Sequence, residues 1–599
     1  MKQALGRLRS ILPYLPEGAV PYMVRYVVLS CLLTLLDVAA LMLLALSLST
    51  MLQGDDVVIP VINFTVSQDN YVWLLVVVSA LILLKSLLSL LQQWFATRRF
   101  TEFELTLGLR LFDAYIGAPW IDRLARSTAT LVRMADVGVA ALVSGLIMPL
   151  IALPAALVST ILILVTLLVV QPLTAVVSIF YLGGIAVLMS VVLSKKTLEA
   201  GSVNQRYSYK VASLMTDMVG ALKEITLRNK FDEVAGEVRS NRKHSTRARA
   251  NIQFLGSIPK FVMDGALVGG FLLVGAISYL VDGNLNDAIG AVVMFAVTSM
   301  RLIPSLLTYQ TTVNTLNSNA AQIDAVLRDL RSADKYRSTT EHLGKEPLLH
   351  DPEELTLDNV TFTYPNRDEP AVSEVSMSIK MGSRVGIVGE SGSGKSTLVD
   401  IILGLLVPQE GKVSVDGQDI TDVMTDWRSR VGYVPQDVSL FDGTIAQNVA
   451  LTWQDDIDTE KVIECLKKAQ MWKAVQERPG GLGAKIGERG IALSGGQRQR
   501  LGIARALYAD PYILIMDEAT SALDTKTEAK ITKALSKLRG EVTVISIAHR
   551  LSTVKDADEL FYMENSFVLA HGTFDEVVAD VPNFREQAQL AGLLEHAEK

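Results

Sequence analysis

Residues 384–397 read RVGIVGESGSGKST, and this stretch decides the fold of the second half of the chain. Its first six residues predict a buried strand, and the turn that follows is rich in glycine. Glycines let backbone N–H groups close around a phosphate, and a helix that starts behind the turn adds its positive dipole end. The sequence therefore predicts a phosphate-binding loop made of Gly389, Glu390, Ser391, Gly392, Ser393, Gly394, Lys395, Ser396 and Thr397. In this loop Lys395 would neutralise the β and γ phosphates, and Ser396 would offer its hydroxyl to Mg²⁺.

A second buried strand is predicted at 512–516, and it ends in the pair Asp517 and Glu518. Transfer of a phosphoryl group to water needs a carboxylate that holds Mg²⁺ and a neighbouring base that activates the water. Asp517 is the candidate metal ligand, and Glu518 is the candidate general base. Two carboxylates after a strand also occur as a helix cap or a solvated strand end, but the phosphate-binding loop upstream favours the catalytic interpretation.

Residues 493–507, LSGGQRQRLGIARAL, contain another glycine-rich turn at the start of a helix. An ATPase does not need two phosphate cradles in one chain, so Ser494, Gly495, Gly496 and Gln497 make sense if this helix faces ATP held by another subunit. With this stretch, residues 355–590 resemble the nucleotide-binding domain of ABC transporters. The resemblance implies an α/β P-loop ATPase domain that binds ATP and Mg²⁺ and works in a dimer.

The resemblance also implies roles for residues outside these three stretches. Tyr364 in FTYP matches the aromatic residue that stacks on adenine, and Gln436 in YVPQD matches the glutamine that senses Mg²⁺ or the γ phosphate. Asp524, at the end of SALD, matches the loop that meets the partner domain, and His549 matches the histidine that contacts the γ phosphate. GERG at 487–490 resembles the cross-talk loop of exporters. All these positions are intact, so the resemblance implies a homodimer with two working sites.

The first half of the chain has a different composition from the ATPase half. Of the 599 residues, 50% are hydrophobic and the mean hydropathy is +0.32, and the apolar excess lies almost wholly before about residue 310. A net charge of −7 argues against nucleic acid as the main partner. Cys31 and Cys465 lie in different halves and have neither metal-ligand spacing nor a disulfide pattern, so function depends on other residues.

Six segments of the first half are long and apolar enough to cross the hydrocarbon core, which takes about 20 residues of helix. They lie at 26–52, 71–95, 138–169, 172–193, 256–281 and 286–309. The basic start of the chain predicts an amphipathic helix at 5–20 on the cytoplasmic membrane surface, because the apolar run behind it is too long for a cleaved signal. We therefore expect a multidomain fold: an all-α membrane domain at 1–332, a polar linker at 333–354 and the ATPase domain at 355–599.

Lysine and arginine set the expected orientation of the spans. The loops at 53–70, 170–171 and 282–285 contain neither residue, whereas 195–250 holds twelve. The N-terminus, the long connections and the ATPase half are therefore expected in the cytoplasm, and the resemblance to bacterial flippases described below implies that the spans lie in a bacterial inner membrane.

Two long connections, at about 96–137 and 194–255, mostly lack turn residues and have apolar positions at helical spacing. This pattern predicts membrane helices that continue into the cytoplasm, turn and come back, so that their tips can touch a soluble domain. The alternative is a pair of cytoplasmic helical hairpins without a mechanical role, which periodicity alone leaves open.

Four ionisable residues lie inside the predicted spans, where a charge is costly: Asp37, Lys85, Asp264 and Arg301. Counted from the outer ends of the spans at about 1.5 Å per residue, all four lie about 21–26 Å deep, in the inner half of the bilayer. One interpretation is two internal ion pairs that fix the packing of the helices. The other is a substrate site in which Lys85 and Arg301 face a cavity and receive an anionic group.

Domain order, span count and helical extensions resemble ABC exporters of the lipid-flippase and multidrug type, in which ATP-driven closure opens the cavity outward. Three phrases are similar to the bacterial lipid-linked-oligosaccharide flippase subgroup: ALKEI at 221–225, PKFVMD at 259–264 and RLIPSLL at 301–307. Asp264 replaces the glutamate expected in that subgroup, and the loop at 53–70 has Pro60 and β-forming residues where that subgroup has a small external helix.

The resemblance implies an ATP-driven, alternating-access exporter that moves a polyprenyl-pyrophosphate-linked oligosaccharide, or another amphipathic lipid, from the inner leaflet outward. Basic side chains at inner-leaflet depth agree with a diphosphate headgroup whose apolar tail stays in lipid. A multidrug, lipid or peptide exporter stays an alternative, in which the same charges only pair with each other. An ATP-gated channel or regulatory subunit is disfavoured, because Glu518 and the SGGQ stretch are intact.

Overall fold

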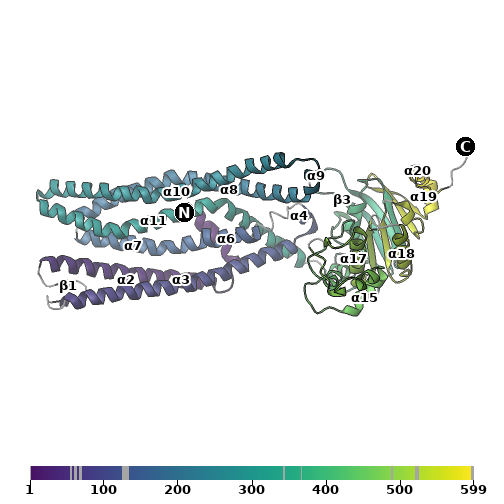
Figure 1. Cartoon of the computed structure of the whole chain (residues 1–599), viewed down its shortest axis with the longest axis horizontal. Helices are drawn as coiled ribbons and strands as arrows, with labels where there is room; N and C mark the ends of the chain where they lie inside the picture. The colour runs from purple at the N-terminus through teal and green to yellow at the C-terminus, as the bar shows by residue number, and fades with distance from the viewer. Residues whose placement is uncertain are drawn as a thin grey trace. The chain divides into compact units, whose positions relative to one another are not determined.

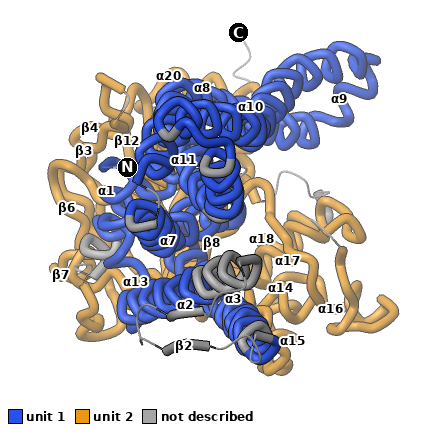
Figure 2. Tube along the Cα trace, turned by 90° about the vertical axis from the view of Figure 1, so that its left-hand side faces the viewer, with its two compact units in different colours: residues 1–118, 124–337 blue, residues 119–123, 338–599 orange. Residues whose placement is uncertain are grey.

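The computed structural model describes most of the chain. The described ranges are 2–53, 57–59, 64–66, 71–124, 134–170, 172–341, 344–365, 367–487, 490–519, 525–548 and 550–594. Two compact units form it, coloured blue and orange in Figure 2. Unit 1 contains residues 1–118 and 124–337, and unit 2 contains residues 119–123 and 338–599.

Unit 1 is a bundle of long helices (Figure 1). Its α-helices are α1 (Lys2–Ile11), α2 (Ala19–Gln53), α3 (Tyr71–Ile116), α6 (Val139–Leu142), α7 (Met148–Val170), α8 (Pro172–Gly220), α9 (Leu222–Leu227), α10 (Phe231–Asp282) and α11 (Leu285–Glu341). Within the described residues, six helices are long and apolar enough to cross a membrane: Ala19–Ala40, Val76–Ile116, Asp136–Leu168, Pro172–Gly220, Phe231–Val281 and Ala288–Tyr336. The predicted class of membrane domain is therefore confirmed.

Several of these helices are longer than a bilayer is thick. Helix α8 has 49 residues and α10 has 52, so each is about 75 Å long, whereas about 30 Å crosses the hydrocarbon core. The two helices pack against each other, and the short α9 joins them at one end (Figure 1). The predicted helical extensions are thus present as unbroken continuations of the membrane helices. Their place in the cytoplasm stays a prediction.

Helix α1 packs on α11 within unit 1. The Arg7 guanidinium donates from Nε and Nη2 to the two carboxylate oxygens of Asp324, at 2.7 Å each. The Tyr14 hydroxyl donates to Asp334 at 2.7 Å. The apolar side chains Ala4 and Ile11 are buried. The start of the chain is therefore fixed to the last helix of the unit, and α1 ends at Ile11, earlier than the sequence pattern predicted.

Two further segments of unit 1 are the connection between α2 and α3 and the C-terminal part of α11. Between α2 and α3, strands β1 (Val57–Ile59) and β2 (Phe64–Val66) pair as an antiparallel hairpin, in agreement with the β-forming residues of that loop. Helix α11 continues to Glu341, so the first part of the segment expected as a linker is helical. Short turns of 3₁₀- or π-helix complete unit 1, at Leu12–Tyr14, Met134–Gly138 and Val143–Ile147.

Unit 2 contains two sheets. Its strands are β3 (Glu354–Phe362), β4 (Val372–Lys380), β5 (Arg384–Gly389), β6 (Glu410–Val415), β7 (Gln418–Asp419), β8 (Val431–Val434), β9 (Ile513–Asp517), β10 (Thr543–Ile547), β11 (Glu559–Glu564) and β12 (Phe567–Gly572). The larger sheet has the order β12-β11-β5-β10-β9-β8 and is parallel except for β12, which is antiparallel to β11. The smaller sheet, β4-β3-β6-β7, is antiparallel.

The helices of unit 2 are α12 (Lys395–Ile402), α13 (Met424–Ser429), α14 (Ile445–Ala450), α15 (Thr459–Lys468), α16 (Trp472–Gln476), α17 (Gly495–Tyr508), α18 (Thr525–Ser536), α19 (Phe574–Asp580) and α20 (Pro582–Leu590). Helices α12, α17 and α19 contact strands of the larger sheet. Ile513, Leu514 and Ile515 of β9 are completely buried, as expected for a parallel strand covered on both faces. Parallel strands end at the same edge of a sheet, so the segments that follow β5, β8 and β9 gather there.

A short segment from the first half of the chain belongs to unit 2. Helix α4 (Trp120–Leu124) follows α3 in sequence, yet residues 119–123 are part of the ATPase unit. Trp120 and Ile121 pack against the apolar core that includes Ile401 of α12 and Trp427 of α13. The tip of the first long connection therefore contributes side chains to the core around α12.

Candidate active site

The phosphate-binding loop between β5 and α12 depends on glycine at two positions. Gly389 has φ +150° and Gly394 has φ +99°, both in the region that side chains rarely adopt. A Cβ atom on Gly389 would lie 2.0 Å from the carbonyl oxygen of Met563, and one on Gly394 would lie 2.2 Å from that of Ala371. The loop can therefore turn tightly into α12 only because these two residues have no side chain.

Lys395, the first residue of α12, is folded onto this loop. Its side chain is buried, and Nζ donates to the carbonyl oxygens of Gly389 at 2.9 Å and Glu390 at 2.6 Å. Burial lowers the pKa of Lys395, while the nearby carboxylates of Glu518 and Asp517 act in the opposite direction. A buried cation at a helix N-terminus is suited to receive a phosphate. The negative charge of the phosphate would compensate for the water that the buried ammonium group has lost.

The two carboxylates after β9 have different partners. The Gln436 side-chain amide donates from Nε2 to Oε2 of Glu518 at 2.9 Å. Glu518 has φ +47°, a strained value for a residue with a side chain, and its backbone N–H donates to Ile547 at 3.2 Å. The turn therefore aims Glu518 away from the strand and next to Gln436. The structure thus brings together two residues that were singled out 82 positions apart.

Asp517 is oriented by a residue that the sequence analysis did not single out. The Tyr433 hydroxyl donates to Oδ2 of Asp517 at 3.2 Å. Burial raises the pKa of Tyr433, and the negative charges of Asp517 and Asp400 raise it further, so the phenol keeps its proton and stays a donor. The signal was present in the sequence, because Tyr433 begins the same YVPQD stretch that contains Gln436.

The oxygen atoms at this edge of the sheet suit Mg²⁺. The candidate ligands are the hydroxyl of Ser396, the amide oxygen of Gln436 and the carboxylate of Asp517, all hard donors. Among the described residues, no group of three or more His, Cys, Asp or Glu side chains could hold a metal by itself. Mg²⁺ commonly binds through one or two carboxylates together with the phosphates of its nucleotide.

Tyr364, the candidate adenine-stacking residue, lies beside the phosphate-binding loop. Its hydroxyl is 3.3 Å from Oγ1 of Thr397, and its ring packs edge-on against Phe362 with the centroids 5.2 Å apart. The half-buried ring is therefore held between β3 and α12, next to the predicted phosphate site.

The SGGQ residues open α17, as predicted. Ser494 is the N-cap, its hydroxyl accepts the N–H of Gln497 at 3.3 Å, and the Gln497 side chain accepts the N–H of Ser494 at 3.0 Å. Gly495 and Gly496 form the first turn of this 14-residue helix. The capping box fixes a helix N-terminus with its positive dipole end, which can attract a phosphate. Helix α17 packs with α14, α15 and β8 in a core cluster distinct from that around α12.

Several candidates lie outside the part of the chain that the structure describes. His549, Asp524 and the central two residues of GERG at 487–490 belong to this group. The backbone of Arg301 is part of α11, but its side chain lies outside the described part. The roles of these residues stay predictions.

The intramembrane charges do not form a single cluster in the described residues. The Nζ atom of Lys85 lies 3.2 Å from Oδ1 of Asp37, and the two side chains are 23% and 12% exposed. Asp264 lies on an exposed face of α10. The structure thus identifies the partner of Lys85, which the sequence left open between cargo and an acid of the protein.

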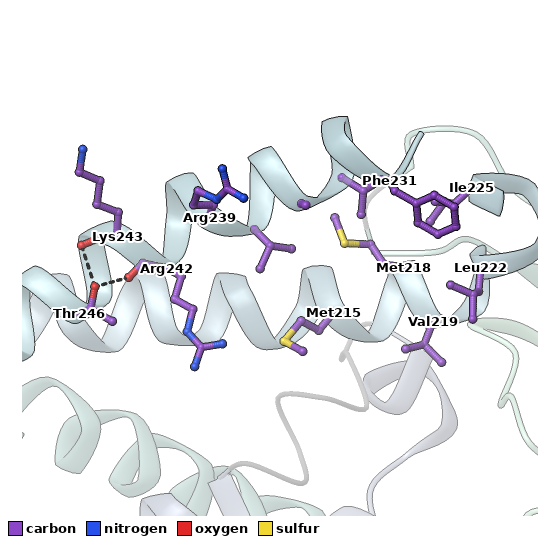
Figure 3. A pocket seen from close by; sticks show the side chains of 13 residues that line it. Met215, Met218, Val219, Leu222, Ile225, Phe231, Arg239, Arg242, Lys243 and Thr246 are labelled. Carbon is purple, nitrogen blue, oxygen red and sulfur yellow. Dashed lines mark hydrogen bonds between the residues drawn. The ribbon is translucent and has the colours of Figure 1, made fainter. Parts of the chain in front are cut away.

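A cavity of about 690 Å³ lies at the end of the α8–α10 pair (Figure 3). Met215, Met218 and Phe231 line its apolar part, and Arg239, Arg242 and Lys243 lie along α10 at one end. Met215 is 43 residues from the start of α8 at Pro172, or about 65 Å along the helix, which is more than twice the hydrocarbon thickness. This cavity is therefore outside the span and is not the substrate site that the intramembrane charges suggested.

Comparison with known proteins places the chain among membrane ATPases. The model of the ABC transporter family matches residues 372–521. The chain is 33% identical over 410 residues to the ATP-dependent lipid A-core flippase of Pasteurella multocida, which covers 67% of this chain and 68% of that protein. It is 43% identical over 234 residues to the sophorolipid transporter of Starmerella bombicola, which covers 37% of this chain and 18% of that protein.

One solved structure covers nearly the whole chain. The bacterial Atm1-family ABC exporter with ATP bound has a TM-score of 0.77 and 24% identity, over 97% of this chain and 100% of that chain. This likeness concerns the fold. Together with the family match, it confirms the predicted architecture of a helical membrane domain followed by an α/β ATPase domain.

Proposed function

The chain belongs to the ABC transporter family, and from this membership we propose that it exports a sugar-bearing amphipathic lipid as a homodimer. Its ATPase domain couples ATP hydrolysis to transport. The observation that supports the proposal most is that the described part of the chain combines six apolar helices with an ATPase unit in which Lys395 contacts the phosphate-binding loop. In the same unit Gln436 contacts Glu518, and Tyr433 contacts Asp517.

We assign the residues of this site by their contacts. Lys395 would exchange the carbonyl oxygens of the loop for the β and γ phosphates. The negative charge of the phosphates would offset the free-energy cost of holding the buried amine in its charged form. Glu518 would accept a proton from the attacking water, and Gln436 would hold its carboxylate in place. Asp517, held by Tyr433, and Ser396 would bind Mg²⁺, which neutralises charge on the phosphates.

The position of α17 supports the proposal of a dimer. The capped N-terminus with Ser494, Gly495 and Gly496 belongs to a different core cluster from the phosphate-binding loop of the same chain. A second copy would supply this N-terminus to the bound ATP, so that two chains make two equivalent sites. No described ATPase residue departs from the pattern, which favours a homodimer over a pair with one inactive site.

The cargo proposal rests on the chemistry shared by relatives. The names of the two relatives above, lipid A-core flippase and sophorolipid transporter, both refer to molecules with a sugar headgroup and apolar chains. A polyprenyl-pyrophosphate-linked oligosaccharide is the more specific form of the proposal and has the same two parts. Because Lys85 is paired with Asp37, a pyrophosphate headgroup would have to compete with that carboxylate.

Orientation is proposed from the charge distribution. Twelve lysines and arginines lie within residues 195–250, and the loop at 53–70 has none. The positive-inside rule then places the ends of the helical extensions and the ATPase unit in the cytoplasm of a bacterial cell, and the β1–β2 hairpin outside.

The test is ATPase activity of the purified chain in lipid vesicles. Four additions are compared at equal concentration: a lipid A-type glycolipid, a polyprenyl-pyrophosphate oligosaccharide, a sugar-free phospholipid and an apolar peptide. We expect the two sugar-bearing lipids to raise turnover above the phospholipid baseline, and Glu518→Gln to lower turnover by at least about 10²-fold with every addition. Stimulation by the peptide alone would contradict the cargo proposal and favour a peptide or drug exporter.

A further inference from the structure

A polar cavity of about 420 Å³ lies between α8 and α10, and it shares no lining residue with the apolar cavity of Figure 3. Lys196 and Glu199 of α8 line it on one side, and His244, Arg247 and Asn251 of α10 line it on the other. Two cations, an imidazole and an amide therefore face one space together with one acid. This set of groups favours an anionic ligand.

The two cations of this cavity are available to a ligand. The side chains of Lys196 and Arg247 form no hydrogen bond or ion pair with the part of the chain that the structure describes. The ring of His244 stacks on that of Tyr207, with the centroids 4.6 Å apart and the planes 20° from parallel. One wall of the cavity is thus fixed by packing, while its positive charges have no acid of the chain to neutralise them.

The cavity lies at the depth of the lipid headgroups. Lys196 is 24 residues from the start of α8 at Pro172, or about 36 Å along the helix. The hydrocarbon core is about 30 Å thick, and the bilayer with its headgroups about 40–45 Å. Residues 172–194 contain no Asp, Glu, Lys or Arg, so α8 meets its first charges here. Leu193 packs against Leu255 of α10 just before the cavity begins, which brings the two helices to the same level.

Exposed apolar side chains continue from the cavity toward the hydrocarbon core. Leu188 and Val192 precede Lys196 by eight and four residues, on the same face of α8, and are 65% and 49% exposed. Phe254 lines the cavity from α10, and Phe261 lies two turns further along that helix; they are 65% and 69% exposed. A ligand with an anionic head in the cavity would therefore find apolar surface for its chains on both helices.

We propose that this cavity binds the phosphate headgroup of an anionic phospholipid of the bilayer, with Lys196 and Arg247 as its cationic ligands. The Arg247 guanidinium can donate two N–H groups to one phosphate, and Lys196 adds a point charge. The carboxylate of Glu199 opposes the anion and limits the affinity. The inference goes beyond the proposed function, because this lipid is a resident ligand and not cargo. In the proposed orientation it belongs to the cytoplasmic leaflet, and it holds α8 and α10 together where they leave the membrane.

Each cation of the site has a matched control on the same helix. Lys196→Gln removes the amine that lines the cavity, and Lys195→Gln makes the same change at the neighbouring exposed lysine, which does not line it. Arg247→Gln is matched in the same way by Arg249→Gln. Glu199→Gln removes the acid of the cavity and should act in the opposite direction. All five side chains are exposed, so the substitutions leave the core of the bundle intact.

The first measurement is binding of a fluorescent short-chain phosphatidylglycerol to the purified full-length chain in a neutral detergent. We expect Lys196→Gln and Arg247→Gln each to weaken binding by about fivefold, the contribution of one basic residue beside an anionic headgroup. Lys195→Gln and Arg249→Gln should stay within about twofold of the unmodified chain at about 0.15 M salt, which screens charges outside the cavity. Glu199→Gln should tighten binding by about two- to fivefold. Equal losses in site and control variants would reveal a diffuse attraction to basic helices and overturn the proposal.

Competition separates a lipid from other anions. Unlabelled phosphatidylglycerol should displace the probe, whereas glycerophosphoglycerol, the same headgroup without chains, should fail at about 100-fold higher concentration because it buries no apolar surface. Phosphatidylcholine should compete at least about tenfold less well, since its ammonium group would meet two cations. Displacement by glycerophosphoglycerol as effective as by the lipid would reveal a site for free anions, and equal competition by phosphatidylcholine would remove the role of charge. Either result would overturn the proposal.

The same probe distinguishes this site from the path of the cargo. If the pattern of variants holds while no glycolipid raises ATP turnover, the cargo proposal fails and the phospholipid site stands. If a glycolipid displaces the probe at a concentration at least about tenfold lower than phosphatidylglycerol does, the cavity serves the cargo and the assignment to a resident phospholipid fails. If the probe binds equally well to all variants, the site fails whatever the cargo is.

Discussion

The ion pair between Lys85 and Asp37 gives the most direct test of the membrane unit. We predict that Lys85→Met destabilises the protein, because it leaves the Asp37 carboxylate without the amine 3.2 Å away. Methionine has a similar length and no charge, so the substitution removes the ion pair with little change in packing. If Lys85 were held in place only for cargo, Lys85→Met would instead stabilise the protein, because an unpaired amine inside a span is itself costly.

The magnitude follows from the exposure of the two side chains. Removing one partner of a fully buried pair costs about 3–5 kcal/mol, whereas a fully exposed pair contributes about 0–1 kcal/mol. Lys85 and Asp37 are 23% and 12% exposed, closer to the buried limit. We therefore expect a loss of about 2 kcal/mol, which lowers the Tm by about 2 °C in a protein of this size.

The assay is thermal unfolding in a lipid-like detergent, with two reference variants. Lys195→Met is the matched control, because it makes the same change at an exposed lysine of α8. The double variant Lys85→Met with Asp37→Asn removes both charges, so its Tm separates the loss of the ion pair from the loss of either charge.

Two results would refute this reasoning. If Lys85→Met lowers the Tm no more than Lys195→Met does, the pair does not stabilise the helices. If the Tm is unchanged while stimulation of the ATPase by glycolipid disappears, the Lys85 amine serves the cargo and its contact with Asp37 is incidental.

Three further outcomes are expected of the ATPase unit. Glu518→Gln should lower ATP turnover by about 10²- to 10⁴-fold and keep nucleotide binding, because only the base is lost; turnover within tenfold of the unmodified chain would contradict its role. Lys395→Met should weaken ATP binding by at least about tenfold, measured with a fluorescent nucleotide, and unchanged affinity would remove the amine from the site. Asp400→Asn should stabilise unit 2 more at pH 8 than at pH 4. The folded-state pKa of Asp400 is raised to about 6, so its proton stabilises the native state below the unfolded value of 3.8, and this contribution is lost as pH rises through about 6. The expected difference at pH 8 is about 1 kcal/mol after allowance for solvent screening, and a difference in Tm that does not vary with pH would contradict it.

Much of the ATPase unit could be predicted from sequence because each motif is continuous and stands in a recognisable setting. The phosphate-binding loop follows a buried strand and precedes a helix, and the SGGQ turn supplies its own cap through Ser494 and Gln497. The contact of Tyr433 with Asp517 joins residues 84 positions apart. Such a contact depends on strand order, with β8 beside β9, which periodicity does not reveal.

The membrane unit was predictable in its helices but not in their contacts. Hydropathy identifies the spans, because each must satisfy its backbone in hydrocarbon. It does not give the rotation or register between helices, so Asp37 could be assigned to Lys85 only from coordinates. The docking of α1 on α11 through Arg7 and Asp324 was missed for the same reason, since these residues are 317 positions apart.

The central claim, ATP-driven movement of a sugar-bearing lipid, is tested most directly in sealed vesicles. A glycolipid with a labelled headgroup is reconstituted with the chain, and a membrane-impermeant quencher reports how much of the label stays in the outer leaflet. ATP added outside acts on molecules whose ATPase unit faces outward, so we predict an ATP-dependent loss of accessible label that Glu518→Gln abolishes. If the accessible fraction does not change with ATP for any glycolipid, while the same vesicles hydrolyse ATP and take up a drug or peptide, the account of the cargo is contradicted.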